Sequence, residues 1–124
     1  MPAALAAWDV DHVPLALAWV FIRLWVNCTF CDVRDVEGDA DAGVRTVPVQ
    51  LGREGSLTFL RQVNAATGAA LLAWAAADGA PLPSTAAHVA SVAFTDLYLC
   101  RAARGGDLEG LTAVGCDGEL IVSA

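Results

Sequence analysis

Three long apolar stretches separated by short polar segments account for most of the 124-residue chain. The first, residues 13–31, has nineteen residues with one charge, Arg23, and one strongly polar side chain, Asn27. The second covers residues 57–77 and the third residues 84–100. A helix of about 20 apolar residues crosses the hydrocarbon core of a bilayer, so these lengths suit membrane spans. None of the stretches has the polar face, repeating every 3.6 residues, that a helix of a soluble bundle needs.

This pattern predicts an all-α fold, a multi-span transmembrane helical bundle. The small residues Ala, Gly, Ser and Thr, which fill the stretches, allow membrane helices to approach one another closely. A last apolar run, about residues 118–124, has the character of the start of another span, and the polar residues 32–54 are expected to form a loop. We therefore interpret residues 1–124 as a single, partial transmembrane domain.

The arginines predict how the bundle is oriented. All seven basic residues are arginine. Six of them follow the first or the third stretch: Arg34, Arg45, Arg53, Arg61, Arg101 and Arg104. The connection between the second and third stretches has none. Because loops that face the cytoplasm collect basic residues, we expect a protein integral to the cell membrane, with the aspartate-rich loop 32–54 facing the cytoplasm.

Composition narrows the possible partners. Fourteen acidic residues against seven basic ones give a formal charge of −7, which excludes a nucleic-acid partner. Hydrophobic residues make up 56% of the chain and charged residues 17%, against about 25% charged in an average soluble domain. This excludes intrinsic disorder and disfavours a soluble domain. A soluble acidic helical domain stays open as an alternative that extraction without detergent would reveal.

The carboxylates are concentrated directly after the first stretch. On a helix, Asp32, Asp35 and Asp39 would fall within about 60° of one another and face one spot. Like charges so close repel, and their pKa values rise unless a cation lies between them. Mg²⁺, which binds one or two carboxylates together with water and a substrate phosphate, suits such a site. The alternative is a solvated acidic loop between membrane helices.

Residues 32–52, DVRDVEGDADAGVRTVPVQLG, resemble the second aspartate-rich motif of the UbiA-type membrane prenyltransferases. That motif is DxxxD followed by GxxT and a hydrophobic LG. The preceding NCTFC segment is similar to the archaeal branches of the family. The resemblance covers nearly the whole chain but only the second half of the family's fold, a helical bundle of nine spans, so it implies a partial UbiA-type prenyltransferase fold.

The resemblance also implies an activity and residue roles. Members of the family transfer a prenyl group from an isoprenyl diphosphate, held through Mg²⁺, to a lipophilic acceptor within the membrane lipid. Carried over to this sequence, Asp35 and Asp39 are metal ligands and Asp32 is an accessory carboxylate. Arg45 and Asn27 are the residues expected to meet the diphosphate.

Two departures from the family pattern qualify this interpretation. The first motif of the family, NxxxDxxxD, occurs nowhere in the sequence, so we expect the chain to be inactive alone and its first half to be supplied by another chain. The alternative is a non-catalytic membrane protein, either a pseudoenzyme remnant or a subunit that completes a site with a partner. In addition, Cys28 and Cys31 form a CxxC pair, which we interpret as incidental burial rather than a metal or redox site.

Aromatic and histidine side chains in the apolar stretches have two interpretations. Trp19, Phe21, Trp25 and Phe30 either line a channel for the prenyl chain or pack against other helices and lipid, and packing is favoured. For His88, a packed or hydrogen-bonded histidine is favoured over a ligand. Arg23, inside the first stretch, needs a polar partner or a path to the interface.

Overall fold

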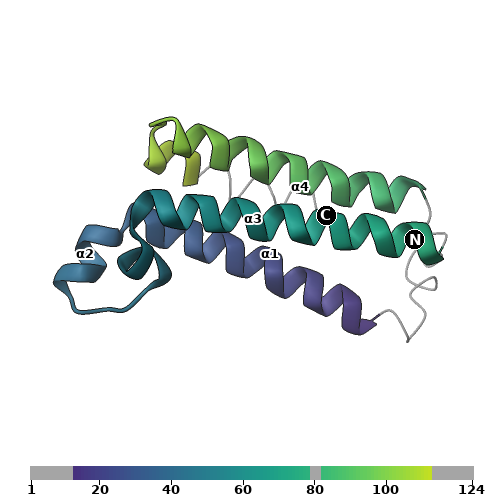
Figure 1. The fold of residues 1–124 in the computed structure, drawn as a ribbon, viewed down its shortest axis with the longest axis horizontal. Coiled ribbons are helices and arrows are strands. Elements are labelled where there is room, and N and C mark those ends of the chain that lie inside the picture. Colours follow the sequence, from purple (N-terminus) through teal and green to yellow (C-terminus); the bar gives the residue numbers. More distant parts are fainter. Residues whose placement is uncertain (1–12, 79–81, 113–124) are drawn as a thin grey trace, which may run out of the picture.

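In the part of the chain that the structure describes, three long helices and one short helix have defined bounds (Figure 1). The computed structural model describes residues 13–78 and 82–112. The helices are α1 (Val13–Arg34), α2 (Val36–Asp41), α3 (Val47–Asp78) and α4 (Leu82–Ala103). Because these ranges contain no strand, the all-α prediction is confirmed for the described part of the chain.

The three long helices lie side by side with alternating direction, and α3 is in contact with both α1 and α4 (Figure 1). The end of α1, the whole of α2, the start of α3 and the end of α4 therefore lie at one end of the bundle, here called the aspartate end. The segment 32–54, expected as a loop, consists of the last turn of α1, the helix α2, a short turn and the start of α3. Inside α3, Gly52 has φ 70° and ψ 171°, a left-handed conformation that kinks the helix there.

The apolar core lies in the half of the bundle nearest the aspartate end. On α1 the buried residues Val26, Phe30 and Val33 recur at the spacing of one helical face. The ring of Phe30 packs against that of Tyr98 on α4, with centroids 5.0 Å apart. The other members of this core come from α3 and α4: Leu57, Leu60, Leu99 and Ala102. Each long helix thus contributes one stripe to a common core.

A buried polar network joins the three long helices beyond this core. Arg23 of α1 is 5% exposed and donates hydrogen bonds to the side-chain oxygens of Asn64 on α3, at 2.6 Å, and Thr95 on α4. The amide nitrogen of Asn64 donates in turn to the backbone carbonyl of Val92, at 3.0 Å. The polar partner expected for Arg23 is therefore present, on two neighbouring helices.

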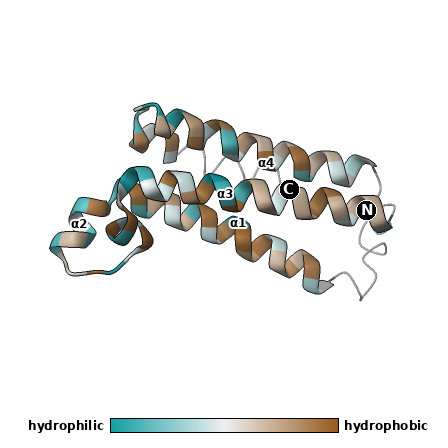
Figure 2. Cartoon of the chain, in the orientation of Figure 1, coloured by the Kyte–Doolittle hydropathy of each residue, from teal (hydrophilic) through white to brown (hydrophobic). Residues whose placement is uncertain are grey.

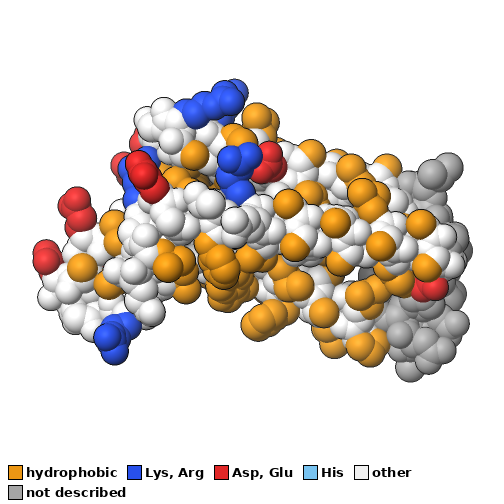
Figure 3. All heavy atoms as spheres, viewed as in Figure 1, with side chains coloured by type: hydrophobic (Ala, Val, Ile, Leu, Met, Phe, Trp, Pro, Cys, Tyr) orange, Lys and Arg blue, Asp and Glu red, His pale blue; other side chains and the backbone are white. Residues whose placement is uncertain are grey.

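The outer surface of the long helices is largely apolar. Large hydrophobic side chains are exposed on all three, among them Leu17, Phe21, Leu72, Val89 and Leu97. Hydrophobic positions run along the helices in Figure 2, and in Figure 3 most charged side chains gather near the aspartate end. Among the described helices, α1 alone is long and apolar enough by length and composition to cross a membrane. The apolar run 118–124 lies outside the described residues.

Candidate functional site

The aspartate end is built around an interruption of the helix at Asp35. Its φ of −97° and ψ of 11° leave the α-helical region, so α1 ends and α2 begins in a new direction. The N–H of Asp35 is shared between the carbonyls of Cys31 and Asp32, at 3.3 and 3.2 Å. The continuous helix assumed for residues 32–39 is therefore wrong, because the chain bends between the first and the last of the three aspartates.

The carboxylate of Asp35 turns back onto its neighbour Arg34. The guanidinium holds both carboxylate oxygens, at 2.7 and 2.8 Å, in a bidentate pair on the surface. This hydrogen-bonded pairing lowers the pKa of Asp35 below its usual value. In this conformation both carboxylate oxygens of Asp35 accept hydrogen bonds from Arg34.

Asp32 and Asp39 form the more enclosed part of the acidic segment. Both side chains are half-buried. Partial burial is the main cause of a raised pKa for Asp32, and the negative charges of Asp39 and Asp35 raise it further. The carboxylates are thus near enough to repel. Within residues 13–78 and 82–112, however, no three His, Cys, Asp or Glu side chains are arranged to hold a metal ion. The structure does not assemble Asp32, Asp35 and Asp39 into a three-ligand cluster.

A glycine turn after α2 leads the chain to the start of α3. Gly43 has φ 72°, its N–H donates to the carbonyl of Ala40, and the N–H of Val44 donates to that of Asp39 at 2.8 Å. This is a Schellman ending, for which glycine is suited because it has no Cβ. The turn places Arg45 and Thr46 directly before α3.

Arg45 and Thr46 both offer unused hydrogen-bond donors. Arg45 is exposed, and within the described ranges its guanidinium has neither a hydrogen bond nor an ion pair. The hydroxyl oxygen of Thr46 is buried and has no hydrogen-bond partner there. Buried polar atoms are nearly always paired, so an orphaned hydroxyl beside an available arginine fits an absent anionic ligand. The sequence motif contained this threonine, but no role was predicted for it.

Asn27 lies farther along α1 and is bound to α4. Its side-chain oxygen accepts a 2.7 Å hydrogen bond from the hydroxyl of Tyr98. Eight residues of helix, about 12 Å, separate Asn27 from Asp35. The structure therefore places Asn27 in a contact between helices, and it gives Tyr98 a role that the sequence analysis missed.

The aromatic residues of α1 lie between helices or at the surface. The rings of Trp19 and His88 meet edge to face, with centroids 5.0 Å apart, and Trp25 packs against Phe59 at 5.9 Å. Phe21 is 69% exposed. These positions agree with the packing interpretation. In the CxxC pair, Cys28 is exposed and Cys31 half-buried, and the two thiols are not joined by a disulfide.

Comparisons with known proteins identify the family. A family model described as VviA prenyltransferase matches residues 7–95, which is 89 of the 124 residues. Neither the curated proteins nor the solved structures give a match. The matched range includes α1, α2, α3 and the first part of α4, and it ends before the last residues of α4 at the aspartate end. Since the match covers well over half of the sequence, the chain belongs to the VviA prenyltransferase family.

Proposed function

We propose that this chain is the C-terminal half of a UbiA-type membrane prenyltransferase, in which the aspartate end binds the diphosphate of an isoprenyl substrate. Membership of a prenyltransferase family supports prenyl transfer as the activity. The observation that carries the proposed site is the orphaned hydroxyl of Thr46 beside the available guanidinium of Arg45. Both follow within a few residues of the half-buried Asp39.

The carboxylates suit a magnesium ion shared with the substrate. Mg²⁺ is usually bound through one or two carboxylates, waters and substrate phosphates, so it needs no cage of three protein ligands. Asp32 and Asp39 are the pair best placed to hold it, and Asp35 joins them only by releasing Arg34. When bound, the metal neutralises the charge that develops on a departing diphosphate.

The basic and hydroxyl groups have a separate task. Arg45 and Thr46 would donate hydrogen bonds to diphosphate oxygens and fix the leaving group at the aspartate end. The prenyl chain, which is apolar, would extend along the bundle and away from water. Asn27, joined to Tyr98, is proposed to contribute through its amide N–H groups at the inner edge of the site.

The apolar surface supports a location in the membrane. A soluble monomer rarely exposes large contiguous apolar patches, and here large hydrophobic side chains are exposed on α1, α3 and α4. We propose that these helices span the bilayer and that the aspartate end faces the cytoplasm, as the arginine distribution predicts. A lipophilic acceptor would then reach the site from the lipid.

Pyrophosphate binding by the purified chain in detergent tests the proposal. Titration calorimetry should show binding that requires Mg²⁺ and that is lost in Asp39→Asn and Arg45→Gln. The matched control is Asp41→Asn, which removes an equal charge from an exposed position on the same helix and should bind normally. Binding that is independent of Mg²⁺, or that falls equally in Asp41→Asn, would contradict the site.

A second candidate function follows from the lack of an NxxxDxxxD motif in the sequence. The chain would then be a non-catalytic membrane protein, a pseudoenzyme remnant or a subunit that completes a site with a partner chain. Mg²⁺-dependent pyrophosphate binding without turnover of any isoprenyl diphosphate by the chain alone favours this candidate. Turnover by the chain alone excludes it.

A further inference from the structure

The ion pair of Arg34 and Asp35 joins a basic group to the acidic segment. Nε and a terminal nitrogen of the Arg34 guanidinium donate to the two carboxylate oxygens of Asp35, at 2.7 and 2.8 Å. The two side chains are 41% and 51% exposed, so water and salt screen their attraction. An exposed ion pair contributes little to stability even when it is well aligned. A partner with a stronger attraction can therefore replace either member.

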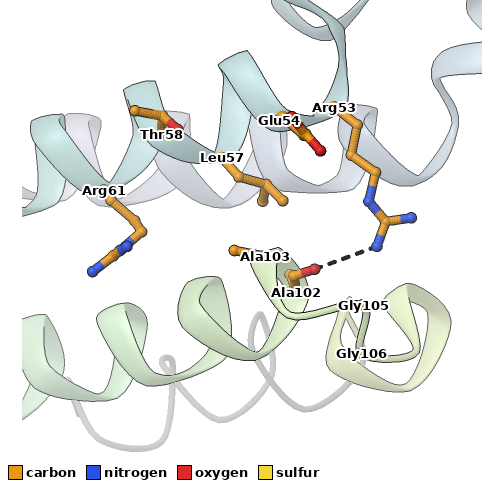
Figure 4. A pocket seen from close by; sticks show the side chains of 9 residues that line it. All are labelled: Arg53, Glu54, Leu57, Thr58, Arg61, Ala102, Ala103, Gly105 and Gly106. Carbon is orange, nitrogen blue, oxygen red and sulfur yellow. Dashed lines mark hydrogen bonds between the residues drawn. The ribbon is translucent and has the colours of Figure 1, made fainter.

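Two other arginines, on the first half of α3, bind elsewhere. Figure 4 shows Arg53 donating to the backbone carbonyl of Ala102, at 3.4 Å. Arg61 pairs with Asp96, with Nε 3.2 Å from a carboxylate oxygen. Both arginines are thus attached to α4, beside a pocket of about 520 Å³ that none of the residues proposed for diphosphate binding lines. Of these three arginines, Arg34 alone is bound to an aspartate of the proposed site.

The carboxylate of Asp35 is close enough to act on Asp32. After partial burial, the negative charges of Asp39 and Asp35 raise the pKa of Asp32. A cation bound by Asp32 and Asp39 would therefore attract Asp35 as a third carboxylate. Because a divalent ion carries twice the charge of a guanidinium, Coulomb attraction favours the ion as the partner of Asp35. Arg34 would then lose both of its acceptors on Asp35.

The guanidinium of Arg34 would then need new acceptors. Its five N–H donors form a planar fork that matches phosphate oxygens. Glu109, on the segment after α4, is a competing acceptor, since its negative charge also acts on Arg34. A diphosphate carries more negative charge than one carboxylate, and it shares the metal with the carboxylates. The diphosphate is therefore the acceptor best suited to replace Asp35.

We propose that Arg34 is a further diphosphate-binding residue, which exchanges Asp35 for the diphosphate when a divalent cation binds the Asp35 carboxylate. The inference rests on the proposed diphosphate site and adds a residue to it. In the unliganded protein the two side chains neutralise each other at the surface. In the liganded protein the aspartate binds the cation and the arginine binds the diphosphate, so each ligand favours binding of the other.

Binding of Mn²⁺ alone, followed by electron paramagnetic resonance of the free ion, tests the first half of the exchange. Mn²⁺ prefers the same oxygen ligands as Mg²⁺. Arg34→Gln should tighten Mn²⁺ binding about threefold, because it frees Asp35 from an exposed ion pair. The matched control is Arg101→Gln, since Arg34 and Arg101 are exposed arginines in the last turns of α1 and α4. This control should leave Mn²⁺ binding nearly unchanged.

A double variant asks whether the effect on Mn²⁺ passes through Asp35. In a chain that already carries Asp35→Asn, the further change Arg34→Gln should no longer tighten Mn²⁺ binding. If Arg34→Gln tightens Mn²⁺ binding equally with and without Asp35→Asn, the exchange is refuted, because the effect does not depend on the pair.

Titration calorimetry with pyrophosphate and saturating Mg²⁺ tests the second half. Arg34→Gln should weaken pyrophosphate binding about tenfold, as expected for the loss of a charged hydrogen bond to phosphate. Arg101→Gln should bind pyrophosphate normally. Loss of a positive charge anywhere at this end of the bundle shifts both affinities in these directions, so equal changes in Arg101→Gln would overturn the exchange.

The unaltered chain separates this inference from the proposed function. If it binds pyrophosphate with Mg²⁺ and Arg34→Gln binds equally well, the diphosphate site stands and the role of Arg34 is refuted. If the unaltered chain does not bind pyrophosphate, the proposed function is refuted and this inference with it.

Discussion

The guanidinium of Arg23 on α1 donates a 2.6 Å hydrogen bond to the side-chain oxygen of Asn64 on α3, 41 positions away in the chain. The same guanidinium donates to Thr95 on α4, so one side chain links the three long helices. Because buried polar groups need partners, this contact favours the arrangement in which α1, α3 and α4 meet at Arg23.

Removing the acceptor from this contact should destabilise the bundle. We expect Asn64→Leu to lower the free energy of unfolding by about 1–3 kcal/mol, because it deprives a buried cation of a partner and frees the carbonyl of Val92. Thermal unfolding in detergent, followed by circular dichroism, measures the effect. Gln62→Leu, at an exposed position on the same helix, should change stability by less than about 0.5 kcal/mol. If Asn64→Leu and the unaltered chain unfold at the same temperature, the contact does not have this role.

Two phenylalanines of α1 should differ sharply in their importance for folding. Phe30 is fully buried against Tyr98, whereas Phe21 is 69% exposed on the outer surface. Phe30→Ala should cost about 3–5 kcal/mol, through lost contacts and a cavity. Phe21→Ala should leave the unfolding of the detergent-purified chain nearly unchanged. A large loss in both variants would show that the outer face of α1 contacts another part of the protein.

For the described residues, the sequence predicted the order of the three long helices because apolar runs of this length have few other stable conformations. The runs 57–77 and 84–100 lie inside α3 and α4. The helix starts were less predictable. α3 begins at Val47, ten residues before the predicted apolar run. Its first ten residues mix apolar and polar side chains and contain the kink at Gly52. Hydropathy carries no information about such an amphipathic first segment.

The site was predictable only where its residues are neighbours in the chain. Arg45 and the aspartates stand together in one sequence motif, so the sequence alone made them candidates for one site. The break at Asp35 was not predictable, because it depends on a local pairing with Arg34 that competes with helix continuation. Asn27 was expected at the diphosphate, but its oxygen accepts from Tyr98, 71 positions away. No local pattern indicates such a distant partner.

A close approach of α3 to α4 at Gly68 should be sensitive to any added side chain. A Cβ placed on Gly68 would lie 3.0 Å from a methyl group of Val92, tighter than ordinary contact. We expect Gly68→Val to force the helices apart and to lower the free energy of unfolding by about 1–3 kcal/mol. Ala69→Val, at the adjacent exposed position, is the control for β-branching in the helix. If both variants melt alike, the helices do not pack closely at this point.

Thr46 should show opposite effects on stability and on ligand binding. Its hydroxyl oxygen is buried without a partner in the described ranges, so Thr46→Val removes an unsatisfied polar group at little change in shape. The unliganded chain should unfold at an equal or higher temperature, because a buried unpaired group costs about 1–3 kcal/mol. Mg²⁺-dependent pyrophosphate binding should nevertheless weaken about tenfold, since a hydrogen bond to a charged oxygen is lost.

Thr67→Val is the control for this prediction. It makes the same change where the hydroxyl already donates to the carbonyl of Val63 at 2.7 Å, and it should leave pyrophosphate binding intact. Unchanged pyrophosphate affinity in Thr46→Val would mean that the hydroxyl is not oriented toward the diphosphate, and the site would then depend on Arg45 and the carboxylates alone.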